Sequence, residues 1–182
     1  DRKDKTRYLV DSAHSVVANF YQEFEAGELT EEEAREAAKK TLNGMRYDES
    51  NYFWINDMEP RMVMHPFNKD LEGESLRDYA DPNGVRLFVE MVNVVKSRGD
   101  GFVGYSWKKV NTSKLAPKIS YVKPFTPWGW VIGSGIYVDD VDAEFYSSAM
   151  KFALSIMVVV LLLGAIAFWI SRAITKPLAK AV

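Results

Sequence analysis

The spacing of apolar side chains in the first quarter of the chain predicts two helices. Over residues 1–25 the apolar positions recur at intervals of three, four and seven, and they are Leu9, Val16, Val17, Phe20 and Phe24. Gly27 ends this helix. Thr30 and Glu33 then form the pattern of a capping box. A second helix should follow, with an apolar side made of Ala34, Ala37, Ala38 and Leu42.

Beyond residue 50 the period of the apolar positions shortens to that of strands. Five strand-like runs are bounded by turn residues, at 52–56, 61–65, 102–110, 118–124 and 130–138. An amphipathic helix over residues 85–96 separates the second run from the third. This order predicts an α+β domain, with five antiparallel strands in one sheet and the helices on one side.

Residues 152–170 are nineteen consecutive residues without a charge. As a helix they would be about 28 Å long, close to the thickness of a bilayer core. They lack the polar stripe of a soluble amphipathic helix, and Trp169 lies near one end. The segment is therefore predicted to cross a membrane.

The charges that flank this segment predict its direction. The acidic side chains Asp139, Asp140, Asp142 and Glu144 precede it, whereas Arg172, Lys176 and Lys180 follow without an acid. Cytoplasmic flanks carry the excess of Lys and Arg, so we expect the C-terminus in the cytoplasm and the preceding domain outside. An outside domain needs a route across the membrane, and we therefore expect a membrane helix before Asp1 in the intact protein.

Composition disfavours several classes of function. The net charge of -2, with acids and bases mixed, does not suit a nucleic-acid binder. The absence of cysteine excludes disulfides and thiol chemistry, and two distant histidines, His14 and His65, do not suggest a metal site. No Ser/His/Asp order or phosphate loop is present, and a helix start explains the acids at 139–142. We expect no enzyme activity, cofactor or metal.

Short sequence blocks in a fixed order carry a family resemblance. They are RY at 46–47, NYFWINDM at 51–58, MVMHP at 62–66, LEG at 71–73, DPNG at 81–84, GFV at 101–103, YVKPF at 121–125 and PWGWVIGSGIYVDDV at 127–141. With these blocks the chain resembles the single Cache, PAS-like extracytoplasmic sensors of methyl-accepting chemotaxis receptors and sensor kinases. The segment ITKPL at 174–178 resembles the start of a HAMP linker.

The resemblance implies a homodimer, a small-molecule pocket on the sheet and signalling through the membrane helices, with short organic acids as common ligands. We therefore expect a sensor at 1–148, a transmembrane helix at 149–171 and the start of a HAMP linker at 172–182. The predicted function is that of a chemoreceptor in the inner membrane with a periplasmic sensor for a small carboxylate. The alternatives are the sensor of a histidine kinase or nucleotide cyclase, and a periplasmic protein-interaction module without a ligand.

Alternation along the strands selects candidate ligand-binding residues. Aromatic side chains that could enclose an anion and offer donors are Tyr52, Trp54, Tyr105, Trp107 and Tyr121. Basic side chains that could meet a carboxylate are Arg46, His65 and Lys118. A basic group among neutral aromatic rings suits an acid better than an amine.

Each of these candidates also has a structural explanation. Trp54 and Trp107 could be core residues, and His65 could be a buried histidine with satisfied hydrogen bonds. Lys118 could be a solvated lysine at a strand end, and Arg46 could pair with Asp48 or Glu49 on the surface. Lys118 and Tyr121 have opposite parity, so both face one pocket only if a bulge near Pro117 or Ser120 intervenes.

Overall fold

A computed structural model describes residues 2–48, 51–110, 112 and 114–178 of the chain. For residues 139–149 and 171–178 the description covers the backbone alone. The acidic and basic flanks that predict the membrane orientation therefore lie outside the described side chains. The chain divides into two compact units, Asp1–Asp139 and Asp140–Val182, and each is described by itself.

The first unit begins with the two predicted helices, α1 (Arg2–Glu25) and α2 (Glu31–Gly44). Thr30 and Glu33 form the predicted capping box, in which the Thr30 hydroxyl accepts from the Glu33 N–H. Reciprocally, the Glu33 carboxylate accepts from the Thr30 N–H at 2.9 Å. The two helices pack together and bury Val10, Ala13, Val17, Ala34, Ala38 and Leu42.

The predicted α+β class with an antiparallel sheet is confirmed, and the sheet has six strands. They are β1 (Arg46–Tyr47), β2 (Asn51–Asp57), β3 (Met62–Met64), β4 (Gly101–Lys108), β5 (Leu115–Phe125) and β6 (Trp130–Tyr137). Their order is β1-β2-β6-β5-β4, and β3 pairs with the C-terminal end of β2. The strand that the sequence prediction lacked is β1, which has only two residues and pairs with the start of β2.

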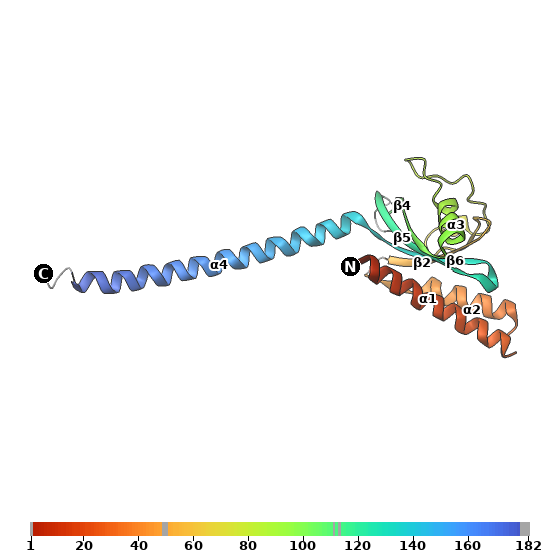
Figure 1. Cartoon of the computed structure of the whole chain (residues 1–182), viewed down its shortest axis with the longest axis horizontal. Helices are drawn as coiled ribbons and strands as arrows, with labels where there is room; N and C mark the ends of the chain where they lie inside the picture. The colour runs from red at the N-terminus through yellow and green to blue at the C-terminus, as the bar shows by residue number, and fades with distance from the viewer. Residues whose placement is uncertain (1, 49–50, 111, 113, 179–182) are drawn as a thin grey trace. The chain divides into compact units, whose positions relative to one another are not determined.

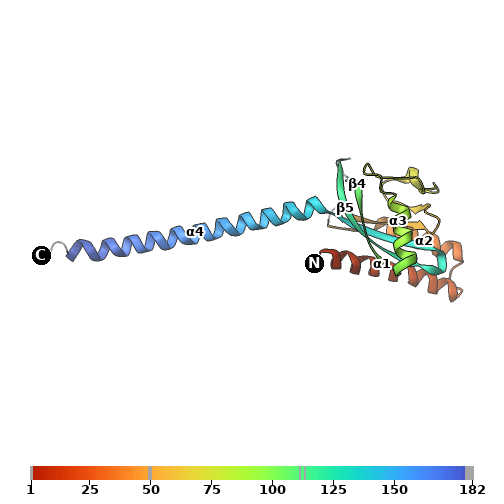
Figure 2. The ribbon, with the colours of Figure 1, turned by 45° about the horizontal axis from the view of Figure 1, so that its top comes forward.

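The helices cover both faces of this sheet, which corrects the prediction that they lie on one side. α1 and α2 lie on one face, whereas α3 (Leu87–Arg98) lies on the other (Figure 1). The reason is visible in β6, where every position is buried and both faces must therefore be covered. Figure 2 shows β4 and β5 running side by side across this sheet.

Regular alternation along β5 divides its side chains between the two faces. Ala116, Lys118, Ser120 and Val122 share the parity that faces α3, and Tyr121 and Phe125 pack with α1 and α2. The register of β5 with β4 and with β6 runs through residues 115–125 without a shift. No bulge therefore occurs at Pro117 or Ser120.

Helix α4 (Val138–Leu178) begins at the residue after β6, and from Asp140 onward it forms the described part of the second unit. Within it, Met150–Ile170 has a mean hydropathy of 2.7, and none of its hydrophobic window is buried against protein. At a rise of about 1.5 Å per residue this segment is about 30 Å long, which matches a bilayer core. By length and composition it can cross a membrane. The sensor, transmembrane and HAMP boundaries given above remain predictions.

Candidate ligand-binding site

The side chain of Lys118 lies at the centre of the face that α3 covers. It is 1% exposed, which excludes the alternative of a solvated lysine at a strand end. In the sheet register Lys118 stands between Tyr105 of β4 and Tyr137 of β6. Its Nζ lies 4.2 Å from the ring centroid of Tyr52, 5.1 Å from that of Tyr137 and 5.5 Å from that of Trp54. Aromatic rings thus surround the ammonium group.

The Lys118 ammonium has no carboxylate partner among the residues that the structure describes. Burial lowers its pKa from 10.5 to about 7. A desolvated cation–π contact contributes about 2 kcal/mol, whereas removing an ammonium from water costs several kcal/mol. The rings alone therefore do not offset the cost of burying this charge, and an anion would complete the site.

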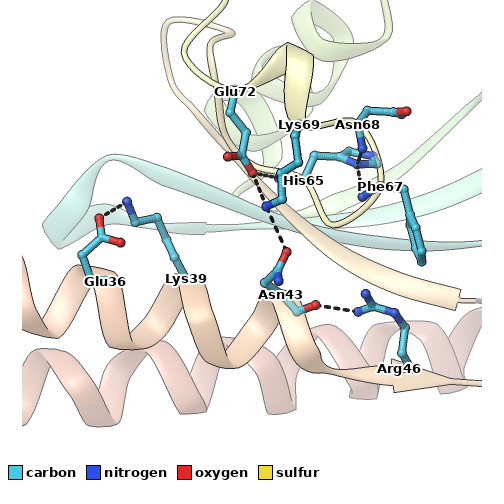
Figure 3. Close-up of polar contacts among 9 residues, drawn as sticks. All are labelled: Glu36, Lys39, Asn43, Arg46, His65, Phe67, Asn68, Lys69 and Glu72. Atoms are coloured by element: carbon cyan, nitrogen blue, oxygen red, sulfur yellow. Dashed lines mark hydrogen bonds and ion pairs between the residues drawn. The ribbon is translucent and has the colours of Figure 1, made fainter.

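His65 follows β3 and stacks edge-on against Tyr52, with the ring centroids 5.0 Å apart. Its Nδ1 accepts hydrogen bonds from the backbone N–H groups of Phe67 at 3.2 Å and Asn68 at 3.0 Å (Figure 3). A neutral imidazole that accepts at Nδ1 carries its proton on Nε2. Burial, and then the positive charge of Lys118, lower the pKa of His65 to about 3. His65 is therefore a neutral N–H donor at physiological pH.

These side chains surround a small inner cavity under α3. Its lining residues are Tyr52, Trp54, His65, Leu87, Phe88, Tyr105 and Trp107. The volume is about 10 Å³, close to the smallest space that accepts one water molecule. Five of the predicted site residues thus line one cavity, and Lys118 lies against the ring of Tyr52.

The walls of the inner cavity are held by close packing and hydrogen bonds. A Cβ atom added at Gly133 would come within 2.3 Å of the Trp54 ring, so glycine lets this indole lie against β6. The Trp54 Nε1–H donates to Asn56 at 3.1 Å. The hydroxyls of Tyr105 and Ser120 lie 2.8 Å apart, within hydrogen-bond distance. Trp54 and Tyr105 are therefore held in place on strands, whereas His65 lies on the loop after β3.

Two cavity residues and one neighbour of Lys118 escaped the sequence prediction. Leu87 and Phe88 line the cavity on the side of α3. The spacing of apolar residues identified them only as part of the buried side of an amphipathic helix. Tyr137 contributes a ring to Lys118. The alternation of residues 130–138 indicates which face Tyr137 lies on. Only the strand order, which pairs β6 with β5, shows that Tyr137 lies beside Lys118.

Arg46 lies at the edge of the site and outside the cavity lining. Its guanidinium is 4.8 Å from the ring centroid of Phe67, which in turn packs 5.1 Å from Tyr52. It also donates to the backbone oxygen of Asn43 at 2.8 Å (Figure 3) and to that of Met45 at 2.7 Å. Of the two surface partners expected for Arg46, Asp48 pairs with Lys5, and Glu49 lies outside the described residues.

Tyr121 is the candidate that the structure places elsewhere, on the sheet face that packs with α1 and α2. Its ring lies 4.9 Å from that of Phe102, which is its partner in the register of β4 and β5. The physical reason is that β5 alternates regularly, so residues 118 and 121 point to opposite faces. The expectation that both share one pocket is corrected here.

Hydrogen bonds and an ion pair of charged side chains hold the loop over residues 65–72 beside the site. Glu72 accepts from the His65 N–H at 2.8 Å and from Lys69 Nζ at 2.8 Å. Lys69 also donates to Asn43 of α2 at 3.1 Å (Figure 3). These bonds tie the segment that carries His65 to the end of α2. Among the side chains that the structure describes, no group of His, Asp and Glu could hold a metal ion.

Two known proteins with similar sequences are a bacterial chemotaxis protein and a bacterial sensor kinase. The chain is 42% identical over 182 residues to the methyl-accepting chemotaxis protein McpP of Pseudomonas putida, covering all of this chain and 33% of McpP. It is 31% identical over 136 residues to the sensor histidine kinase MctS of Rhizobium johnstonii, covering 75% of this chain and 29% of MctS. The chain thus spans about a third of the length of these relatives.

Two solved structures resemble the sensor unit closely. One is a periplasmic sensor domain of a chemotaxis protein, with a TM-score of 0.74, 51% identity, and coverage of 75% of this chain and 95% of that one. The other is a Cache chemosensory domain studied for carboxylic acid recognition, with a TM-score of 0.73, 44% identity, and coverage of 75% and 93%. The family model described as single Cache domain 2 matches residues 1–151, and the chain belongs to this family.

Proposed function

We propose that this chain is the sensor and membrane helix of a transmembrane chemoreceptor, and that the sensor binds a short-chain carboxylate beside Lys118. One observation carries the proposal. Lys118 is a buried ammonium enclosed by aromatic rings, without a carboxylate partner in the described part of the chain. A bound anion supplies the missing opposite charge, and the low local dielectric strengthens that pair.

The chemistry of the cavity selects a carboxylate over other small molecules. Lys118 offers a charged donor, and His65 offers a neutral N–H donor on the same wall as Tyr52. The lining contains no acidic side chain, so an amine would find no opposite charge. Aromatic and aliphatic side chains make up the rest, which suits a short alkyl or keto group. The inner cavity as it stands has room for about one water molecule, so a carboxylate needs its ring walls to move apart, and the shortest acids need the least movement.

The comparisons support a chemoreceptor more than a kinase. The relative named a chemotaxis protein is 42% identical, and the relative named a sensor kinase is 31% identical. A neighbouring Cache domain is described as recognising carboxylic acids. The residues after Val182 in the intact protein distinguish these outputs, because long helices with a heptad pattern follow the membrane segment in a chemoreceptor.

Signalling in this proposal uses the direct connection between β6 and α4. The sensor is periplasmic, α4 crosses the inner membrane, and the C-terminus is cytoplasmic. Tyr137 contacts Lys118 and is followed at once by the first residue of α4. A ligand that binds two arrangements of β6 with different affinities shifts the balance between them. We propose that the receptor is a homodimer, which analytical ultracentrifugation of the intact protein in detergent checks.

Titration calorimetry of the 182-residue chain in lipid nanodiscs tests the binding proposal. The probes are acetate, propionate and succinate, with acetamide and propionamide as neutral matches and ethylamine as a cation. We expect a carboxylate to bind at millimolar concentration or tighter and the neutral and cationic probes to bind at least about a hundredfold more weakly. The proposal fails if no carboxylate binds in this range, or if an amide binds as tightly as its acid.

A further inference from the structure

A second, larger hollow lies on the outer side of the inner cavity. This outer groove has a volume of about 450 Å³ and lies between the loop over residues 68–82 and strands β4 and β5. Its apolar walls include Leu71, Tyr79 and Leu115. Trp107 lines the outer groove and the inner cavity alike. Trp107 therefore borders both a space for one water molecule and a space for a much larger group.

Aromatic rings hold this indole in place. The ring centroid of Trp107 lies 5.6 Å from Tyr79, 6.0 Å from His65, 6.1 Å from Phe88 and 6.2 Å from Tyr105. Trp107 is 6% exposed, whereas Tyr79 is 38% exposed. Tyr79 is thus the more exposed of the two rings, and aromatic packing holds the indole in place.

We infer that Trp107 is a specificity-determining residue that sets the upper chain length of the acid bound beside Lys118. This inference rests on the proposed carboxylate site. A carboxylate at Lys118 directs its alkyl chain away from the ammonium and into the ring-lined cavity. Each added methylene then needs apolar space, and with Trp107 in place the lining leaves room for about one water molecule. Beyond Trp107 lie the apolar side chains of the outer groove.

Asp81 is an acidic residue of the outer groove, and its carboxylate already accepts hydrogen bonds from the protein backbone. Asp81 accepts from the N–H groups of Asn83, Val85 and Ser106, each within 2.9 Å. These bonds fix the turn at 81–85 against β4, next to Trp107. These bonds hold the groove wall in place, so removal of the indole would open a formed apolar space to an alkyl chain.

Isothermal titration of the 182-residue chain in nanodiscs with acetate, butyrate and hexanoate tests this inference. We expect the wild type to prefer acetate to hexanoate. Trp107→Ala should raise the affinity for hexanoate relative to acetate by at least about tenfold, since one methylene in an apolar pocket is worth about 10- to 200-fold. Trp107→Phe and Tyr79→Ala should move the ratio in the same direction by less. Leu115→Ala, which changes the groove and leaves Trp107 in place, should leave the ratio unchanged.

The outcomes separate this inference from the proposed function. A wild type that binds acetate and hexanoate equally overturns the size limit and leaves the carboxylate site standing. A folded Trp107→Ala protein with the wild-type ratio also overturns it. Should circular dichroism show that Trp107→Ala is unfolded, an unchanged ratio in both Trp107→Phe and Tyr79→Ala overturns it instead. If the wild type binds none of the acids, the proposed function and this inference both fall.

Discussion

The two faces of the sheet bury side chains of different character. The face under α1 and α2 packs aliphatic and aromatic side chains, among them Val17, Ile55 and Ile132. The face under α3 encloses Lys118 within aromatic rings and has a small cavity. Burial of apolar side chains stabilises a fold, whereas burial of an unpaired ammonium destabilises it. This difference is consistent with the proposal that the first face supports the domain and the second binds the ligand.

The largest expected effect is the loss of binding in Lys118→Met. The side chain keeps its length and loses its charge, which leaves a bound carboxylate buried without a partner. We expect acetate affinity to fall by about 3 kcal/mol or more, which is over a hundredfold. Calorimetry measures this directly. The unfolding free energy of the ligand-free protein should rise at pH 6, because a buried charge is removed.

Lys123→Met is the matched control for Lys118→Met. Lys123 lies on the same strand, but its side chain pairs with Asp11 of α1 at 2.5 Å. We expect acetate affinity to stay within about twofold of wild type, while stability changes by about 1 kcal/mol or less. Equal losses of binding in the two variants would show that net charge, and not the site beside Lys118, controls affinity.

The next largest effect concerns the supporting face. Ile132 is 0% exposed and packs in the core with α1 and α2. Ile132→Ala should lower the unfolding free energy by about 2–5 kcal/mol, because it leaves a cavity in a close-packed core. Urea denaturation followed by tryptophan fluorescence measures this loss. Acetate affinity of the folded variant should not change, and a tenfold change would contradict the division of roles between the faces.

The pH dependence of stability should differ between wild type and Lys118→Met. The pKa of Lys118 is about 7 in the folded protein and about 10.4 in an unfolded chain. Between these values the unfolded chain holds a proton that the folded protein lacks. The unfolding free energy of the ligand-free wild type should therefore rise with pH, by at most about 1.4 kcal/mol per pH unit. Lys118→Met should lack this contribution, and parallel curves from pH 7 to 10 would contradict the buried-lysine account.

The smallest effect is expected from two tyrosine substitutions on opposite faces. Tyr105→Phe removes a hydroxyl that borders the site and bonds with Ser120, and should weaken acetate binding about threefold to tenfold. Tyr121→Phe removes a hydroxyl from the other face and should change the affinity less than twofold. Calorimetry on both variants sharpens the comparison. A larger loss of affinity in Tyr121→Phe than in Tyr105→Phe would place the ligand on the face under α1 and α2 and contradict the proposed site.

Most of the fold follows from local signals in the sequence. The capping box at Thr30 and the apolar period of residues 1–25 define α1 and α2 because helices depend on near neighbours. The long apolar run defines the membrane-length part of α4 in the same way. The two-residue β1 was not predictable, because a strand of this length has no period of its own.

The covering of both sheet faces was harder to predict. Helix α3 has a clear apolar side, but its sequence does not say which face of the sheet that side covers. The strand order supplies the answer, since β6 lies in the interior of the sheet and is buried at every position. Strand order is a long-range property that alternation within single strands does not carry.

The candidate site was predictable to the extent that alternation determines it. Parity along β2 placed Tyr52 and Trp54 together, and both line the cavity. Parity also showed the conflict between Lys118 and Tyr121, which the unbroken register of β5 resolves. The burial of Lys118 was not predictable, because it depends on Leu87, Phe88 and the loop after β3 closing over the strand.

The most direct test of the central claim is the uptake of protons when acetate binds. At about pH 8 most Lys118 side chains in the ligand-free protein are neutral, and a bound carboxylate favours the charged form. Calorimetry in two buffers of different ionisation enthalpy should show an uptake of about one proton per acetate at pH 8, and much less at pH 6. Binding at pH 8 without proton uptake, or with equal uptake in Lys118→Met, would contradict the account.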